Sequence, residues 1–188
     1  MEIISTDRVR LRTWQSSDQI PFAQMNADPQ VMEHFPGILT ENETEALILR
    51  INEHIRCHQF GLWAAELKET KEFIGFIGLS IPSFSTHFTP CVEIGWRLAR
   101  QYWGKGLATE GAKAVLDYGF TQINLDEIVS FTATINYRSR RVMEKIGLIR
   151  QEKDDFDNPK LALDHPLSKH VLYRLSQMQW RARLKKSP

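Results

Sequence analysis

The chain has 188 residues, of which 42% are hydrophobic and 25% charged, and its formal net charge is +1. This composition is that of an ordinary globular protein, and the length allows one domain with a substantial core. The near-zero charge argues against a dedicated nucleic-acid-binding protein, which would carry a clear basic excess. We therefore expect a single domain over residues 1–188 and no direct nucleic-acid partner.

The cysteines and the N-terminal residues indicate the cellular compartment in which the protein is expected. Cys57 and Cys91 are too few to form a disulfide framework in a chain of this size. The first residues lack the basic stretch and apolar run of a signal peptide. No segment approaches the ~18 consecutive apolar residues of a membrane span. We expect a reducing, cytoplasmic setting and no membrane partner.

In chain order, the first predicted element is a strand over residues 3–11, in which apolar and basic side chains alternate. A short helix capped by Ser16 or Ser17 follows. The Asp28-Pro29 pair, with proline at the first helical position, predicts a second helix.

A longer helix and a hairpin come next. Thr40 and Glu43 form a capping-box pattern, and apolar residues recur behind them at four-residue intervals. This spacing predicts an amphipathic helix to about residue 59. Residues 62–67 and 73–79 then read as two strands joined by a polar turn, which favours an antiparallel hairpin.

The second half alternates strands and helices. After a proline-containing loop at residues 80–90, we expect a strand at 92–98, a helix at 107–122, a strand at 128–133, a helix at 136–146 ended by Gly147, and strands at 148–152 and 170–175. This order predicts an α/β (α+β) fold with a mixed, mostly antiparallel central sheet flanked by helices.

The turn between the strand at 92–98 and the following helix has the character of a phosphate site. Gly104 and Gly106 let the backbone curl so that successive N–H groups converge. The helix that follows directs its positive end to the same point, which suits a pyrophosphate. Lys105 either adds a cation or points to solvent. The alternative is that the two glycines only form a surface turn.

Two familiar nucleotide motifs do not match this turn. A Walker A loop requires serine or threonine where Gly106 stands, and a dinucleotide fingerprint requires a third glycine that is here displaced to Gly111. A third pattern does match, in which glutamine or arginine is followed by two residues, glycine, one residue, and glycine or alanine. Gln101, Gly104 and Gly106 satisfy it.

With this pattern, the chain resembles the Gcn5-related N-acetyltransferase (GNAT) superfamily, and within it the ribosomal-protein N-terminal (RimJ/RimL-type) acetyltransferases. Four ordered blocks carry the resemblance: residues 6–12, the strand Glu93-Ile94-Gly95-Trp96-Arg97-Leu98, residues 104–111, and Asn136-x-x-Ser139 with the helix end at 143–148. The resemblance covers nearly the whole chain and is weakest at residues 80–90 and 154–168.

The resemblance implies the GNAT acyl-CoA N-acyltransferase fold, with splayed fourth and fifth strands, and acetyl-CoA as co-substrate. In that family the exposed edge of the fourth strand pairs with the pantetheine arm of CoA, which places main-chain groups of Trp96 and Leu98 there. The implied CoA-binding residues are Trp96, Leu98, Gln101, Gly104, Lys105, Gly106, Leu107, Ala108, Asn136 and Ser139.

Acyl transfer to an amine requires a base for the amine proton and an acid for the leaving thiolate. Glu93 is the predicted base, although it fits equally well as a salt-bridged structural glutamate. Many relatives carry a tyrosine acid at the position of Met143, which cannot donate a proton. Ser139 is therefore the predicted substitute, with Tyr173 in reserve. Cys91 has no visible histidine partner and is expected to be passive.

The resemblance favours a protein N-terminal amine as acceptor, and a small-molecule amine is the alternative. A non-catalytic acyl-CoA-binding sensor is the alternative of another class, because Met143 stands at the usual acid position. His54 and His58 have zinc-compatible spacing, but without a third ligand we predict no metal. We expect a monomer or homodimer.

Overall fold

The computed structural model describes residues 1–185, and these form two compact units. Unit 1 consists of Met1–Ser80 and Gly95–Val115, and unit 2 consists of Ile81–Ile94 and the chain from Leu116 onward. The chain passes between the units within strand β5 (Glu93–Leu98) and within helix α3 (Leu107–Thr121). The single domain expected over residues 1–188 stays a prediction.

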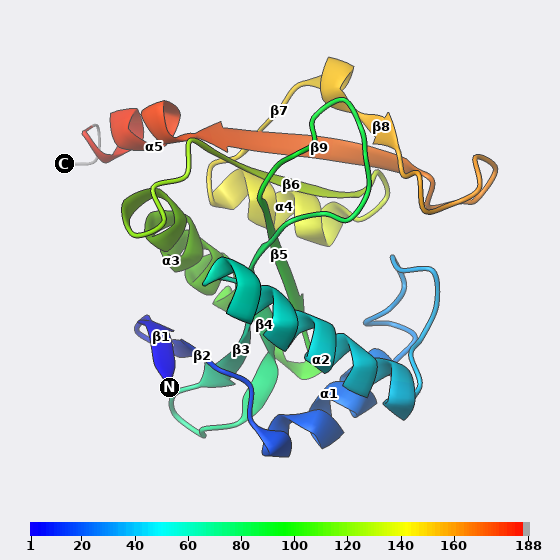
Figure 1. Cartoon of the computed structure of the whole chain (residues 1–188), viewed down its shortest axis with the longest axis vertical. Coiled ribbons are helices and arrows are strands. Elements are labelled where there is room, and N and C mark those ends of the chain that lie inside the picture. Colours follow the sequence, from blue (N-terminus) through cyan, green and yellow to red (C-terminus); the bar gives the residue numbers. More distant parts are fainter. Residues whose placement is uncertain (186–188) are drawn as a thin grey trace. The chain divides into compact units, whose positions relative to one another are not determined.

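Unit 1 contains an antiparallel sheet whose strands follow one another in the sequence. They are β1 (Glu2–Ser5), β2 (Val9–Arg12), β3 (Leu62–Leu67) and β4 (Phe73–Ser80). The β3–β4 pair places Trp63 opposite Ile77, which confirms the predicted hairpin. On the far side of β4, the Ala99 N–H, just after β5, donates to the Ile74 carbonyl at 2.9 Å. Figure 1 shows these strands in chain order.

The single strand predicted over residues 3–11 is wrong, because the chain reverses at Thr6 to form β1 and β2. The Thr6 N–H donates to the Val9 carbonyl, and the Val9 N–H donates to the Thr6 hydroxyl, both at 2.9 Å. A threonine side chain that bonds nearby backbone in this way closes a turn. Alternation of side chains continues across the turn and therefore does not reveal it.

The helices of unit 1 follow local capping signals with one exception. Helix α2 (Glu41–His58) begins with the predicted capping box, in which the Glu43 N–H donates to Thr40 Oγ1 and the Thr40 N–H donates to Glu43 Oε2. The short helix before it is confirmed as η1 (Ser16–Asp18) and α1 (Gln19–Asn26). The helix predicted at Asp28-Pro29 is wrong. One turn forms there and then ends, because Pro36 and Gly37 follow too closely for a longer helix.

Unit 1 buries an aromatic core and a compensated arginine. Phe22 of α1 packs against Trp14, Phe73 and Phe76, with ring centroids 4.9 to 6.0 Å apart. The buried Arg12 donates to both oxygens of Asp18, at 2.7 and 2.8 Å, and to Glu66 at 2.7 Å. Those two carboxylates neutralise the Arg12 charge that burial would otherwise leave unpaired.

Unit 2 is built on two long antiparallel strands, β6 (Glu127–Ala133) and β9 (Lys169–Ser176). Strands β7 (Ile149–Arg150) and β8 (Phe156–Asp157) pair antiparallel with β9, and Glu93 of β5 pairs in parallel with Val129 of β6. Helix α4 (Tyr137–Lys145) follows β6, as predicted, and α5 (Gln177–Leu184) follows β9. Figure 1 shows β9 running along β6.

The predicted fold class, a mixed and mostly antiparallel sheet with flanking helices, is confirmed. Within unit 2, the predicted strand at 148–152 is shorter than expected, and β8 and α5 were not predicted. The splay of the fourth and fifth strands, here β5 and β6, depends on how the two units are placed and stays a prediction.

Candidate functional site

The predicted phosphate turn lies in unit 1, between the 3-10 helix η2 (Arg100–Tyr102) and α3. Gly104 has φ +74° and Gly106 has φ +80°, a region that residues with a side chain rarely adopt. A Cβ on Gly104 would meet no heavy atom within 4 Å. The backbone conformation, rather than lack of space, therefore requires glycine here, and it turns consecutive N–H groups toward one side.

Helix α3 begins directly after this turn. Its first i to i−4 hydrogen bond runs from the Glu110 N–H to the Gly106 carbonyl at 3.0 Å. The N–H groups of Leu107, Ala108 and Thr109 precede that bond and have no acceptor inside the helix. They form the positive end of the helix dipole. Lys105, in the turn itself, is exposed, and its Nζ lies 5.7 Å from the Tyr102 ring centroid. Convergent N–H groups with a nearby cation fit the pyrophosphate of CoA.

A set of hydrogen bonds to Glu110, which the sequence did not predict, supports this turn. Glu110 accepts hydrogen bonds from the Thr6 hydroxyl at 2.6 Å, the Arg8 N–H at 2.8 Å and Arg8 Nε at 2.6 Å. The same guanidinium donates to the Lys105 carbonyl at 3.0 Å. Burial would raise the pKa of Glu110, but the bonds from Thr6 and Arg8 outweigh it and lower that pKa. Glu110 thus joins the β1–β2 turn to the first turn of α3.

The main-chain groups near the end of β5 point alternately to its two edges. The Ala99 N–H points to β4, and a Cβ on Gly75 of β4 would overlap the Arg97 carbonyl. Because main-chain groups alternate along a strand, those of Trp96 and Leu98 point to the opposite edge. The Leu98 carbonyl accepts a hydrogen bond from Trp103 Nε1 at 2.7 Å. Trp103, also missed from sequence, thus occupies one acceptor lone pair at that edge.

In unit 2, Asn136 and Ser139 meet at the start of α4. The Asn136 amide oxygen accepts from the Ser139 N–H at 3.2 Å, and its Nδ2 donates to Thr132 Oγ1 at 2.9 Å. Asn136 is therefore the N-cap of α4. Ser139 is half-buried, and its hydroxyl has no hydrogen-bond partner within residues 1–185. That hydroxyl is free to donate to a ligand.

Tyr173, the alternative candidate for the acid, has a hydrogen-bond partner for its hydroxyl. Its hydroxyl donates to Glu144 at 2.9 Å, and burial raises its pKa. Met143 is buried, with 1% of its surface exposed, so it packs in the core.

Glu93, the predicted base, is half-buried at the start of β5. The nearby Cys91 thiol is partly buried. Burial and, second, the Glu93 charge raise the Cys91 pKa to about 11. A thiol with this pKa is protonated at neutral pH and is a poor nucleophile, as expected for a passive cysteine.

The predicted residues thus fall into two groups. Those of the turn and the β5 edge lie together in unit 1: Trp96, Leu98, Gln101, Gly104, Lys105, Gly106, Leu107 and Ala108. Glu93, Asn136 and Ser139 lie in unit 2.

A family-wide sequence profile for the acetyltransferase (GNAT) domain matches residues 8–149. The chain belongs to the GNAT acetyltransferase family. It is accordingly an acetyl-CoA-dependent N-acetyltransferase, and the predicted co-substrate is confirmed. The sensor alternative that Met143 had kept open is wrong, since the family assignment is to enzymes.

Similarity to other proteins extends over most of this GNAT chain. The uncharacterized protein YkkB of Bacillus subtilis is 36% identical over 144 residues, covering 76% of this chain and 83% of the relative. A GNAT-family acetyltransferase structure from Bacillus anthracis is 27% identical, has a TM-score of 0.75, and covers 93% of this chain and 98% of that one. The ribosomal L7/L12 alpha-N-protein acetyltransferase RimL shares the fold, with TM-score 0.76, 12% identity, and coverage of 94% and 98%.

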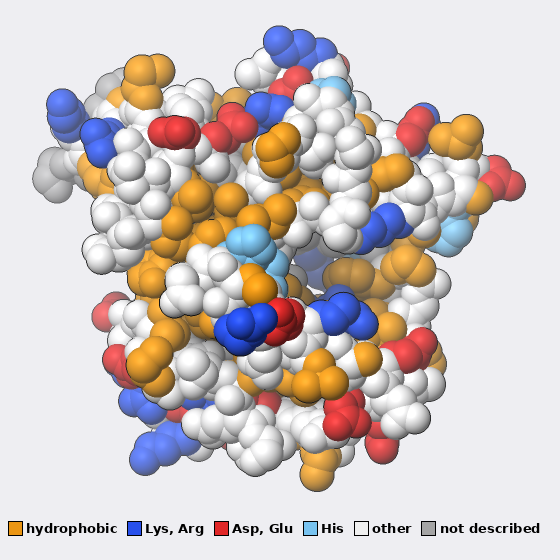
Figure 2. Space-filling view, viewed as in Figure 1, with side chains coloured by type: hydrophobic (Ala, Val, Ile, Leu, Met, Phe, Trp, Pro, Cys, Tyr) orange, Lys and Arg blue, Asp and Glu red, His pale blue; other side chains and the backbone are white. Residues whose placement is uncertain are grey.

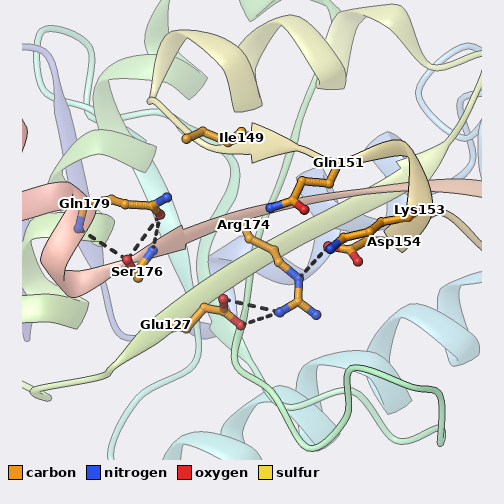
Figure 3. Close-up of a pocket in the computed structure, with 8 residues that line it drawn as sticks. All are labelled: Glu127, Ile149, Gln151, Lys153, Asp154, Arg174, Ser176 and Gln179. Carbon is orange, nitrogen blue, oxygen red and sulfur yellow. Dashed lines mark hydrogen bonds and ion pairs between the residues drawn. The ribbon is translucent and has the colours of Figure 1, made fainter.

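A separate hollow of about 330 Å³ in unit 2 of the GNAT enzyme contains none of the predicted site residues. It is lined by Glu127, Ile149, Gln151, Lys153, Asp154, Arg174, Ser176 and Gln179. Figure 3 shows its central Arg174 bonded to neighbouring carboxylates, with Nη1 3.0 Å from Glu127 and Nε 3.2 Å from Asp154. Two carboxylates thus surround the Arg174 guanidinium in this hollow.

Two further observations concern residues 1–185. They contain no group of three or more His, Cys, Asp or Glu side chains that would hold a metal ion. None of their helices is long and apolar enough to cross a membrane. Figure 2 shows acidic and basic side chains interspersed on the face in view.

Proposed function

We propose that this GNAT enzyme transfers the acetyl group of acetyl-CoA to the N-terminal amine of a protein, by direct attack of the amine on the thioester. The observation that supports the binding of acetyl-CoA is the pair of positive-φ glycines at the start of α3. The proposal of a protein N-terminus as acceptor depends on the four sequence blocks that resemble the ribosomal-protein branch. A small-molecule amine is the alternative acceptor, and we place the reaction in the cytoplasm of the cell.

In unit 1, we assign the pyrophosphate to the backbone N–H groups around Gly104–Ala108, with Lys105 and Gln101 beside them. We assign the pantetheine arm to the main-chain groups of Trp96 and Leu98, which point away from β4. The Trp103 indole supports this assignment, because it fixes the Leu98 carbonyl at 2.7 Å and so stiffens the edge on which the arm would lie.

In unit 2, we assign the proton transfers. Glu93 accepts the proton that the amine loses as the new C–N bond forms. Ser139 donates a proton to the thiolate that leaves when the C–S bond breaks, and its unpaired hydroxyl supports that role. Asn136 holds the helix turn that presents Ser139, through the 3.2 Å bond to the Ser139 N–H. Acetyl-CoA supplies the activated acyl group, so no covalent enzyme nucleophile is required.

The test is release of free CoA thiol with a panel of N-terminal peptides and small amines. We expect Glu93→Gln to lower kcat about 100-fold, the lower range for loss of a general base, and to remove the acidic limb of the pH–rate profile. Ser139→Ala should lower kcat roughly 10- to 100-fold. Both variants should keep the thermal stabilisation given by CoA.

Matched controls are Glu45→Gln and Ser85→Ala, which replace exposed residues of the same types. Thiol release only with small amines would refute the protein acceptor. Native turnover in Glu93→Gln would show that Glu93 is structural. Absence of CoA binding in the native protein would refute the assignment of Gly104 and Gly106.

A further inference from the structure

Arg97, on β5 in unit 1, is a partly buried cation for which the described residues provide no counter-ion. Its Nη1 donates to the Asn26 amide oxygen at 2.7 Å, and that oxygen is uncharged. Its Nε is buried with no hydrogen-bond partner among the described residues. No carboxylate within residues 1–185 forms an ion pair with it. Burial lowers the Arg97 pKa to about 10, so the guanidinium is still charged at neutral pH.

The contrast with Arg12 in the same unit makes this arrangement informative. Arg12 is buried, with 5% of its surface exposed, and Asp18 and Glu66 surround it with charged acceptors at 2.7 to 2.8 Å. An isolated buried charge is costly unless a partner compensates it. A neutral, apolar residue at position 97 would avoid that cost. The arginine at this position is explained if a bound ligand supplies the missing anion.

The surroundings of Arg97 fix the direction in which it can donate. The guanidinium carbon lies 4.0 Å from the ring centroid of Phe35 and 5.4 Å from that of Phe76. Aromatic rings that cover the guanidinium leave its edge N–H groups as the donors, in the fork that matches a carboxylate. Phe76 is buried, whereas Phe35 is 37% exposed, so the Phe35 side of the clamp faces solvent.

We propose that Arg97 binds a carboxylate of the acceptor, so that the acceptor is an amine that also carries an acidic group. This inference rests on the proposed function, which places the thioester at the main-chain edge of Trp96 and Leu98. The acceptor amine must come within about 3.5 Å of the thioester carbon. Arg97 lies between those two residues in the strand, so it is close enough to hold another part of the same acceptor.

Two kinds of acceptor carry both an amine and a carboxylate. One is a protein N-terminus with an acidic side chain nearby, and the other is a free amino acid. The partly buried positive charge also disfavours polycationic acceptors such as polyamines, because like charges repel more strongly where water is partly excluded. Acceptor choice would thus be set by one side chain outside the acyl-transfer groups.

The experiment compares acceptors that differ only in charge. Peptides with Asp or Glu at the second position are paired with their Asn or Gln counterparts, and free amino acids are paired with their amides. We expect the native enzyme to favour the acidic member about 10- to 100-fold in kcat/KM, mainly through KM, as for a buried charge-assisted bond. Arg97→Met should abolish the preference, and Arg97→Gln, which keeps a donor for Asn26, should do the same.

Arg100→Met is the matched control, because it removes an exposed arginine three residues away. The preference should survive in that variant, and CoA should stabilise all the variants equally. A native enzyme without charge preference would overturn the inference, as would a preference that persists in Arg97→Met. Reduced CoA affinity in Arg97→Met and Arg97→Gln, with the acceptor preference intact, would assign Arg97 to the CoA site instead.

If no amine in the panel is acetylated, the proposed function fails for those amines, and Arg97 is tested by binding alone. N-acetylated acidic dipeptides and their neutral counterparts are titrated against the CoA-bound protein while its melting temperature is followed. We expect only the acidic dipeptides to stabilise the native protein, and Arg97→Met to lose the effect. Equal stabilisation by both kinds, or by neither, would overturn the inference.

Discussion

Replacing Gly104 or Gly106 by alanine tests the basis of the CoA assignment. Both glycines have left-handed backbone, at φ +74° and +80°. A Cβ at Gly104 meets nothing within 4 Å, and one at Gly106 approaches Arg8 Nη2 at 3.5 Å, an ordinary contact. The cost is therefore the left-handed conformation itself, about 1–2 kcal/mol for a residue with a Cβ.

This cost appears in one of two measurements. If the turn keeps its shape, the free energy of unfolding falls by that amount, less the roughly 0.4–1 kcal/mol that alanine gains by restricting the unfolded chain. If the turn relaxes, the N–H groups diverge, and CoA must restore the strained shape on binding. The dissociation constant for CoA then rises about 5- to 30-fold, since each 1.4 kcal/mol is tenfold.

The assays are chemical denaturation and calorimetric titration with CoA. Gly37→Ala is the matched control, because a Cβ there also meets nothing within 4 Å and its φ lies outside the left-handed region. We expect Gly37→Ala to keep native CoA affinity. Should Gly104→Ala and Gly106→Ala match Gly37→Ala in both assays, the turn does not depend on its left-handed glycines and our assignment of the pyrophosphate is wrong.

Two further predictions concern stability. Burial lowers the pKa of His170, so the folded protein keeps it neutral at pH values where the unfolded chain, with a pKa near 6.5, takes up a proton. The stability of the native protein should therefore fall as pH drops below about 6.5. In His170→Gln, the melting temperature should depend less steeply on pH between pH 7.5 and 5.5. An unchanged pH dependence in this variant would contradict the prediction. Gly75→Ala should lower the free energy of unfolding by about 3 kcal/mol or more, because its φ is +137° and its Cβ would overlap the Arg97 carbonyl. Denaturation measures this, and a loss as small as that of Gly37→Ala would refute the close approach.

Local signals in the sequence predicted most elements correctly. The Thr40–Glu43 capping box begins α2 where expected, and Asn136 caps α4. These features depend on hydrogen bonds between residues three or four apart, which a linear reading captures. Sequence patterns failed at Thr6, because the alternation of side chains continues across the turn there and does not reveal it. They also failed at the two-residue strand β8, which is too short to show a period.

The sequence by itself determined the family, most of the strands and helices, and the turn at Gly104–Gly106, because each is a pattern of neighbouring residues. Only the tertiary structure decided which distant groups support that turn. Glu110 is bonded to Arg8 across 102 positions, and Arg97 lies against Asn26 across 71. No local periodicity encodes such pairs, since they exist only once strands and helices pack. The same packing leaves Arg97 without the carboxylates that Arg12 receives, a difference in charge compensation that two arginines in a sequence do not reveal.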